Sequence, residues 1–354
     1  MRAVVARKQQ LVVDTIDDPI PGPGEVLVAV KACGICGSDL HALKYGDLMV
    51  EQAAQAGMPT NFNPQLDYIM GHEFCCEVLE LGAENQGVSI AVGDLVTSIP
   101  IALNTSGIEP IGAYSNVYNG AYADKMRLTA AMCIKVPNGL DARRSALTEP
   151  MAVGRHAVAK GDVTERDEAL VLGCGPVGLA VIAELKRRNV RTIIATDFSP
   201  MRRAVGAAMG ATEVVDPTTE PGIDAWRRVS GGSKPLVIFE AIGVPGILDQ
   251  AMKDAPPQSR IVIVGVCMQT DAVHPFVGIS KELRLQFVLG YDFMEFSDTL
   301  RGIAEGEINV DPILTGVCGL DAVSDAFAAL ENPESHVKIL VEPESAAGLV
   351  SLAG

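Results

Sequence analysis

The sequence has little positive charge. Its 28 Lys and Arg residues are outnumbered by 44 Asp and Glu residues, which leaves a formal net charge of −16 at pH 7. A field of that sign repels polyanions, so the composition argues against nucleic acid and anionic membrane surfaces as partners. Aromatic residues are scarce, at 5%, yet hydrophobic residues make up 48% of the chain. The chain can therefore bury a core and does not belong to the disordered class.

Long apolar runs are also missing. The longest near-continuous one, residues 261–268, is far shorter than the ~18 residues that a membrane span requires. The first residues, Met1 to Arg7, contain no cleavable apolar segment. We therefore expect a cytoplasmic protein with no membrane partner.

The eight cysteines are scattered along 354 residues and lie mostly in apolar segments. A disulfide framework is typical of much shorter secreted chains, so we expect reduced thiols. Reduced thiols are available as metal ligands.

The residue pattern divides the chain into two structural classes. In the first 100 residues, short runs of alternating apolar and polar residues are separated by turn residues, which predicts an all-β region. The expected strands are 3–5, 11–14, 25–33, 77–82 and 94–99. Residues 47–67 and 100–124 have no clear period and are expected to be long loops.

From about residue 150, strands alternate with helices, which predicts an α/β fold with a doubly wound parallel sheet. The expected strands are 169–173, 191–197, 236–240 and 261–265, and the expected helices are 176–188 and 200–209. The pattern at the end of the chain predicts helices at 294–305 and 322–330 and a strand at 337–342. It does not show against which part of the fold these elements pack.

A glycine-rich turn lies between the first expected strand and helix of the α/β region. Residues Gly173-Cys-Gly-Pro-Val-Gly178 fit G-x-G-x-x-G, in which Gly173, Gly175 and Gly178 allow a pyrophosphate to approach the helix N-terminus. Asp197 closes the next strand, where a carboxylate binds a ribose diol and repels a 2′-phosphate. We therefore expect NAD rather than NADP, while a purely structural turn remains the alternative.

Further nucleotide contacts are expected at the carboxyl ends of neighbouring strands, where open α/β sheets bind ligands. Arg202 follows Asp197 closely and either flanks the adenosine or is a solvated helix charge. The other expected contact residues are Val177, Ile242, Val264 and Val266.

A second group of residues suggests a metal. Cys36 and His41 stand in Cys-Gly-Ser-Asp-Leu-His after an expected strand, and Gly71-His-Glu73 precedes another. A thiolate, an imidazole and carboxylates form the mixed ligand set of a catalytic zinc. Taken singly, a Cys or His is more often a packing or surface residue.

The ordered motifs Gly34-Ile-Cys-Gly-Ser-Asp-Leu-His41, Gly71-His-Glu73, Val92-Gly-Asp94, Glu149-Pro150 and Gly173 to Gly178 resemble the zinc-dependent medium-chain alcohol dehydrogenases, especially the polyol, threonine and secondary-alcohol branch. The resemblance covers nearly the whole chain. It implies a GroES-like, partly open β-barrel catalytic domain at 1–150, an NAD-binding Rossmann domain at 151–290, and a return of 291–354 to the catalytic domain. The nicotinamide is then expected beside the metal, between the domains.

The resemblance also implies the metal ligands. Cys36, His72 and Glu149 match the zinc ligands, and Glu73 matches a movable carboxylate that binds zinc or stands behind a water. Asp39 matches the acceptor that orients the ligand histidine. Alternatively, Glu149 caps a helix and Asp39 caps a turn.

Relatives often carry a second, structural zinc held by four cysteines after the Val-Gly-Asp motif. Residues 95–132 contain no cysteine, so we expect one catalytic zinc per subunit and no structural zinc. Cys33 and Cys36 form a C-x-x-C pair without a second pair to complete a four-cysteine site, which leaves a redox dithiol as a minor alternative.

The resemblance implies a proton relay and a basic contact. Ser38 takes the hydroxyl proton and passes it through the cofactor ribose to His41. Lys338 matches a basic residue that reaches the pyrophosphate and the orienting aspartate. In the alternative interpretations Ser38 is a cap, His41 a solvated histidine and Lys338 a surface lysine.

The expected reaction is hydride transfer between an uncharged secondary alcohol or diol and NAD, in a homo-oligomer that pairs through edge strands of the Rossmann sheet. Two loops are expected to supply the substrate pocket, through Tyr45, Met49, Met58, Phe62, Asn104, Tyr114 and Tyr118. The alternatives are a zinc-free quinone or enone reductase of the same superfamily and a non-catalytic NAD-binding protein.

Overall fold

The computed structural model describes residues 1–58, 60–104, 107–112, 115–232 and 234–352. It divides the chain into two units. The first comprises residues 1–149, 314–332 and 338–354, and the second comprises residues 150–313 and 333–337. No described helix is long and apolar enough to cross a membrane.

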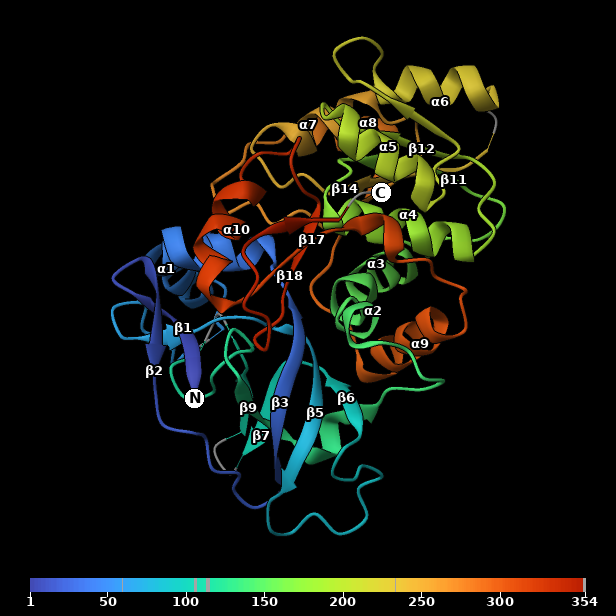
Figure 1. The fold of residues 1–354 in the computed structure, drawn as a ribbon. Helices are drawn as coiled ribbons and strands as arrows, with labels where there is room; N and C mark the ends of the chain where they lie inside the picture. Colours follow the sequence, from blue (N-terminus) through green and yellow to red (C-terminus); the bar gives the residue numbers. More distant parts are fainter. Residues whose placement is uncertain (59, 105–106, 113–114, 233, 353–354) are drawn as a thin grey trace. The chain divides into compact units, whose positions relative to one another are not determined.

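The first unit is built on an eight-stranded sheet in the order β10-β6-β5-β3-β18-β17-β19, with β9 also paired to β3. The long antiparallel pair β3 (Glu25–Gly34) and β5 (Glu73–Leu81) forms its centre (Figure 1). The remaining strands of this sheet are β6 (Leu95–Ser98), β9 (Lys125–Thr129), β10 (Cys133–Lys135), β17 (Leu314–Cys318), β18 (Lys338–Val341) and β19 (Val350–Ser351).

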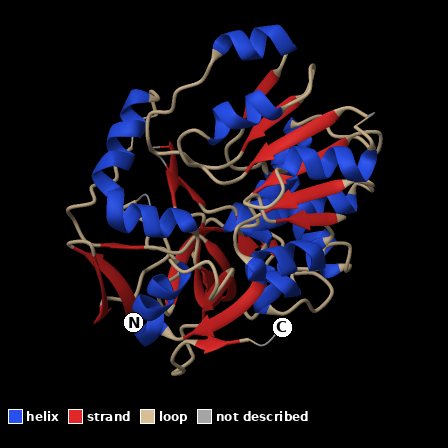
Figure 2. Cartoon of the chain, turned by 90° about the horizontal axis from the view of Figure 1, so that it is seen from above, coloured by secondary structure: helices blue, strands red, loops and turns tan. Residues whose placement is uncertain are grey.

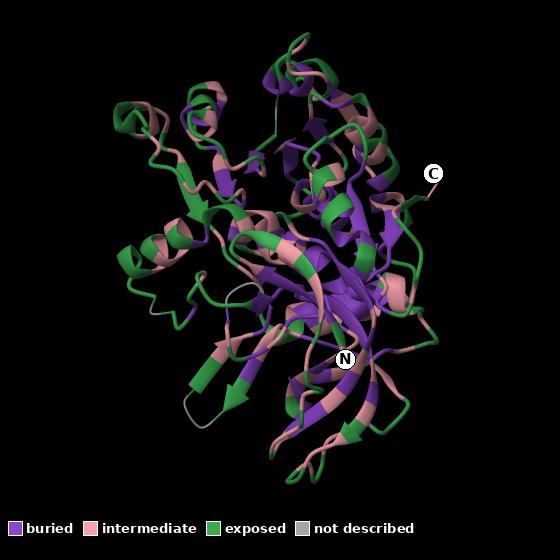
Figure 3. Ribbon diagram, turned by 60° about the vertical axis from the view of Figure 1, so that its left-hand side comes forward, coloured by how far each residue is buried: buried purple, intermediate pink, exposed green. Residues whose placement is uncertain are grey.

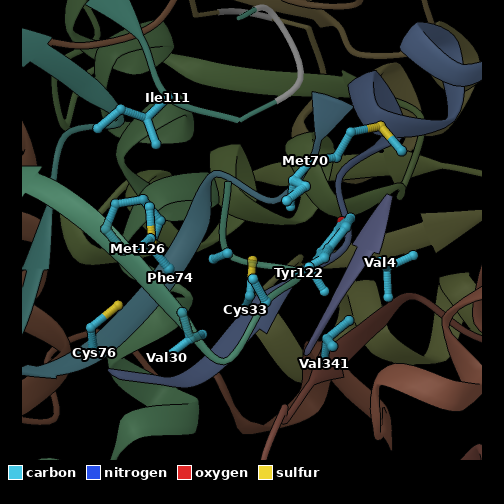
Figure 4. Packing of buried hydrophobic residues seen from close by; sticks show 14 of the residues in the cluster. Val4, Val30, Cys33, Met70, Phe74, Cys76, Ile111, Tyr122, Met126 and Val341 are labelled. Carbon is cyan, nitrogen blue, oxygen red and sulfur yellow. The ribbon is translucent and has the colours of Figure 1, made fainter. Parts of the chain in front are cut away.

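Two smaller sheets and several helices complete this unit. The order β2-β1-β4 joins β1 (Arg2–Arg7), β2 (Gln10–Thr15) and β4 (Tyr68–Ile69), and β7 (Ile101–Asn104) pairs antiparallel with β8 (Gly107–Pro110). The helices are α1 (Gly37–Gln55), α2 (Ala142–Ala146) and α10 (Val323–Leu330). The apolar residues that alternate along the strands pack into one core, part of which Figure 4 shows, and Figure 3 shows the buried stretches concentrated in strands.

The second unit has a six-stranded parallel sheet in the order β13-β12-β11-β14-β15-β16. Because the order reverses at β11, the chain winds outward in both directions, and Figure 2 shows helices on both sides of the strands. The strands are β11 (Glu168–Leu172), β12 (Ile193–Thr196), β13 (Glu213–Val215), β14 (Leu236–Glu240), β15 (Arg260–Ile263) and β16 (Arg284–Phe287). The helices are α4 (Pro176–Arg187), α5 (Pro200–Met209), α6 (Gly222–Ser230), α7 (Ile247–Asp254), α8 (Pro275–Lys281) and α9 (Phe293–Ala304). Helix α3 (Thr148–Lys160) begins in the first unit and continues in the second.

The fold class and the doubly wound sheet are confirmed, but three local expectations are wrong. Residues 47–55 are the second half of α1 rather than loop, and residues 101–104 and 107–110 are the paired strands β7 and β8. The chain returns to the first unit at residue 314, not 291. Helix α9 stays in the second unit because Phe296 and Leu300 are buried there and Glu295 contacts His156.

Candidate functional site

The residues of the first unit that could bind a metal are brought together by two elements, α1 and β5. Cys36 precedes the first turn of α1, and His72 and Glu73 stand at the start of β5. One ligand atom from each of Cys36, His72 and Glu73 can be chosen so that all lie within 4.8 Å of one another. Residues 36 positions apart in the chain therefore converge on one point with sulfur, nitrogen and oxygen donors, the set that suits a catalytic zinc.

Asp39 both caps α1 and faces His72. Its Oδ2 accepts a hydrogen bond from Cys36 N at 3.0 Å, and its Oδ1 lies 3.3 Å from His72 Nδ1. Burial opposes a charged imidazole, but the Asp39 carboxylate and the Cys36 thiolate raise the pKa of His72 well above its usual value. Burial likewise opposes the Asp39 charge, yet the pKa of Asp39 is lowered by His72 and by hydrogen bonds. The capping and orienting interpretations of Asp39 are thus compatible in one residue.

Since Nδ1 of His72 faces Asp39, a metal would be bound through Nε2. Ser38 Oγ lies 3.5 Å from that Nε2. His41, one turn further along α1, is half-buried, and burial followed by the charge of Lys44 lowers its pKa. It is therefore a neutral imidazole near pH 7, able to accept a proton.

Glu73 is engaged by a lysine from the far end of the chain. Lys338 Nζ donates to Glu73 Oε1 at 2.7 Å, to Oε2 at 2.8 Å and to the carbonyl oxygen of Ile35 at 2.9 Å. Both side chains are 1% exposed. All three ammonium hydrogens are used within the chain, so Lys338 is not a surface lysine, and it pairs with Glu73 rather than with Asp39. The expected contact with a pyrophosphate stays a prediction.

Glu149 lies in the first turn of α3 and is 9% exposed. It is not among the residues of the 4.8 Å cluster. Burial lowers the pKa of Lys338, but Glu73 and Cys36 outweigh it and raise the pKa, and the negative charge of Glu149 adds a smaller effect in the same direction. Glu149 therefore lies in the surroundings of the cluster, and its role as a ligand stays a prediction.

Cys33, the partner of Cys36 in the C-x-x-C pair, is fully buried. Burial raises the pKa of its thiol well above the usual value, with Asp39 and Glu73 adding to the effect. A thiol held protonated is a poor nucleophile, which argues against a redox dithiol.

Two of the expected pocket side chains pack within the first unit. Phe62 is 5% exposed with its ring edge-on to Tyr68, and the Tyr118 hydroxyl donates to Glu25 at 2.9 Å. Tyr45 is half-exposed on α1, and the expected residue Tyr114 lies outside the described residues.

The glycine turn of the second unit has the geometry of a phosphate cradle. Gly173 has φ +95°, and a Cβ at Gly178 would lie 1.9 Å from the Gly173 carbonyl oxygen. Gly175 is the N-cap of α4, and a Cβ there would meet no atom within 4 Å. Two glycines are thus required by the fold of the turn, whereas Gly175 leaves open space in front of the helix N-terminus.

Asp197 is fixed beside this turn. Its Oδ2 accepts from Cys174 N at 2.8 Å and its Oδ1 from Ser199 N at 2.9 Å. Nε of Arg202 is buried and has no hydrogen-bond partner among the described residues. The carboxylate expected to bind the ribose is therefore held by the chain at the end of β12.

The other expected nucleotide contacts line the neighbouring strand ends. Ile242 and Val266 are exposed, at 41% and 57%, while Val264 is buried at 7%. Val177 is partly buried in the first turn of α4. Exposed apolar side chains beside a phosphate cradle suit the flat faces of nucleotide rings.

Tyr122 stands in none of the sequence motifs, yet its hydroxyl donates to Asp39 Oδ2 at 2.6 Å. The pairing of Lys338 with Glu73 was likewise not expected from the sequence. Neither contact has a local signal, because the partners are 83 and 265 positions apart.

Comparisons with known proteins agree with this geometry. The family model described as alcohol dehydrogenase GroES-like domain matches residues 22–138, and the model described as zinc-binding dehydrogenase matches residues 176–305. An (R,R)-butanediol dehydrogenase of Bacillus subtilis (strain 168) is 33% identical over 343 residues, which cover 94% of this chain and 96% of that protein.

Solved structures give the same result. The crystal structure of 2R,3R-butanediol dehydrogenase from Bacillus subtilis superposes with a TM-score of 0.84 at 30% identity, covering 97% of this chain and 99% of that one. A zinc-binding dehydrogenase from Sinorhizobium meliloti 1021 bound to NADP gives a TM-score of 0.81 at 25% identity, covering 97% and 99%. The chain belongs to the zinc-dependent medium-chain alcohol dehydrogenase family and is an oxidoreductase of that type.

Proposed function

We propose that the protein oxidises an uncharged secondary alcohol or diol, and reduces the corresponding ketone, with NAD and one catalytic zinc per subunit. The observation that carries this proposal is the convergence of Cys36, His72 and a carboxylate beside Ser38, in a chain that also holds a phosphate cradle with Asp197. A protein that only bound NAD would have no use for the first group.

The donor set fits zinc. Cys36, His72 and Glu149 are the proposed ligands, and Glu73 is the carboxylate that competes with them when it leaves Lys338. Zinc held there would lower the pKa of a bound alcohol oxygen by several units and so make proton loss accessible near neutral pH.

The chain's own residues then move the proton. Ser38 Oγ lies on the Nε2 side of His72, where a bound hydroxyl group would lie within its reach. We expect Ser38 to accept the hydroxyl proton and neutral His41 to take it up, and a bound cofactor would supply the ribose hydroxyl groups that connect the two. The half-buried position of His41 gives it access to solvent for the final release.

NAD is the proposed cofactor because Asp197 is held where a 2′-phosphate would meet a carboxylate. The NADP-bound relative makes this choice a matter for experiment. Arg202 is the residue that would favour NADP if its guanidinium turned toward the ribose.

For the substrate we propose a vicinal diol or a similar small secondary alcohol. The butanediol dehydrogenase names of the relatives support this class. A net charge of −16 also disfavours an acidic substrate.

We further propose a homo-oligomer formed through the open edge of the parallel sheet. All four residues of the edge strand β16 are exposed, and α8 before it has no buried residue. Phe276, Ile279 and Phe287 are 78%, 72% and 64% exposed. An unpaired edge flanked by apolar side chains can pair antiparallel with a second copy. Replacing Phe287 with Asp should give monomers in sedimentation, and an unchanged molecular mass would refute the contact.

The function is tested by following NAD reduction with 2,3-butanediol, other diols, polyols and simple secondary alcohols, with and without a chelator. We expect turnover with secondary alcohols, its loss on chelation and its recovery with added zinc. Chelator-resistant reduction of quinones or enones, or no turnover at all, would overturn the proposal. The predicted cytoplasmic location is tested separately by cell fractionation.

A further inference from the structure

We propose that Tyr122 is a positioning residue for the metal site, which fixes His72 by holding the Asp39 carboxylate. This inference rests on the proposed zinc site and adds to it a residue that lies outside every motif used to recognise that site.

Tyr122 makes a single strong polar contact. Its hydroxyl donates to Asp39 Oδ2 at 2.6 Å, and its other neighbour, the Gly34 carbonyl oxygen, is at 3.4 Å. A hydroxyl group has one hydrogen to give, so the shorter, charge-assisted bond to the carboxylate takes it. Both side chains are fully buried, which leaves no solvent to replace this bond.

The bond determines which oxygen of Asp39 serves His72. Tyr122 and Cys36 N both donate to Oδ2, which leaves Oδ1 directed at His72 Nδ1 at 3.3 Å. A fixed partner at Nδ1 sets the ring orientation and directs Nε2 toward a metal. The chain Tyr122–Asp39–His72 therefore ends on a proposed ligand without Tyr122 touching it.

The backbone around Tyr122 is tied to the segment that carries His72. Tyr122 N donates to Met70 O at 2.9 Å and Ala121 N to Gly71 O at 2.8 Å. The ring packs so closely on Gly71 that a Cβ there would lie 2.8 Å from it, and Figure 4 shows Tyr122 among Met70, Cys33 and Val4. The phenol is thus rigidly placed by its ring and backbone, and the hydroxyl can be removed without disturbing either.

The test measures zinc rather than turnover. Zinc-loaded wild type and Tyr122→Phe protein are mixed with a chromogenic chelator, and the rate of zinc release is followed. Loss of the orienting bond should speed release by about tenfold, the lower end of the range for partners of metal-binding histidines. Tyr118→Phe is the matched control, because it removes a buried phenol hydroxyl that bonds Glu25 instead, and it should release zinc like wild type.

The double variant distinguishes positioning from a general loosening. If Tyr122 acts through Asp39, then Tyr122→Phe should change the release rate by less than about twofold in an Asp39→Asn background. Cobalt-substituted protein provides a second measurement on folded protein only, and its visible bands should shift in Tyr122→Phe and not in Tyr118→Phe.

Wild-type release rates and an unshifted cobalt spectrum in Tyr122→Phe would overturn the inference and leave the zinc proposal standing. So would a full additional effect of Tyr122→Phe in the Asp39→Asn background. A wild-type protein that binds no zinc would overturn both the inference and the proposed function.

Discussion

Replacing Lys338 with Met should destabilise the first unit substantially. The substitution keeps an apolar side chain of similar length but removes the ammonium that donates to both oxygens of Glu73 at 2.7 and 2.8 Å. Both side chains are 1% exposed, so the carboxylate would be left buried and unpaired. Breaking a buried pair in this way costs about 3–5 kcal/mol.

The assay is urea unfolding of metal-free protein followed by far-UV circular dichroism, with Trp226 fluorescence alongside. Trp226, the single tryptophan, lies in the second unit, so it reports on the unit that Lys338 does not stabilise directly. With an m-value of about 2 kcal/mol per molar urea, the transition of the first unit should fall by roughly 1.5–2.5 M.

The matched control is Lys135→Met, which breaks an ion pair with Asp94 on a lysine whose side chain is 57% exposed. That variant should lose no more than about 1 kcal/mol. Adding Glu73→Gln to Lys338→Met should restore part of the loss, since the unpaired charge is removed. A Lys338→Met protein as stable as the control would refute the reasoning.

The same pair predicts alkaline sensitivity. Burial lowers the pKa of Lys338, but Glu73 and Cys36 outweigh it and raise the pKa above the ordinary 10.5. Because the folded-state pKa is the higher one, the contribution to stability is complete below about pH 10.5 and is lost as the pH rises through the folded-state value. Lys338→Met should lack this alkaline loss.

Three further predictions concern the cofactor and the proton path. Gly175→Ala should fold like wild type, because its Cβ meets no protein atom, but it should bind NAD weakly, because the Cβ occupies the open space in front of the helix. Gly178→Ala should also lower the melting temperature, because its Cβ would clash with the Gly173 carbonyl. Equal melting temperatures of the two variants would count against the cradle. Asp197→Ser should raise the kcat/KM ratio of NADP over NAD by about 10- to 100-fold, since charge-assisted bonds contribute about 1.5–3 kcal/mol, and an unchanged ratio would refute its role. Since burial and Lys44 lower the pKa of His41, kcat/KM should fall only below pH 6.5 in wild type, and this acid limb should disappear in His41→Gln; an identical pH profile would exclude the relay.

Features that depend on local sequence were predictable. The strand, glycine turn and helix at residues 168–187 follow from neighbouring residues, because the turn geometry and the buried strand are both local. The second half of α1, residues 47–55, was not predictable from neighbouring residues in this way. The buried residues of the helix, Asp39, Ala42 and Gly46, all lie in the first half, and the helix is kinked at Tyr45. In residues 47–55 only partly buried side chains such as Met49 and Val50 pack against the core, so the helical period is weak there.

Contacts between residues far apart in the sequence could not be predicted. Helix α9 is amphipathic whichever unit receives it, and contacts such as Arg187 with Asp298, 111 positions apart, hold it in the second. The pairing of Lys338 with Glu73 depends in the same way on β18 lying beside β3. The order of the motifs predicted which residues lie near the metal site, but their hydrogen-bond partners became known only from the structure.

The zinc-dependent reaction is tested most directly by metal analysis combined with NAD reduction for wild type and Cys36→Ser. We expect one zinc per subunit in wild type and loss of both zinc and turnover in Cys36→Ser. NAD reduction with 2,3-butanediol should be abolished by chelation and restored by zinc. A wild-type enzyme that turns over the diol at full rate without bound zinc would contradict this expectation.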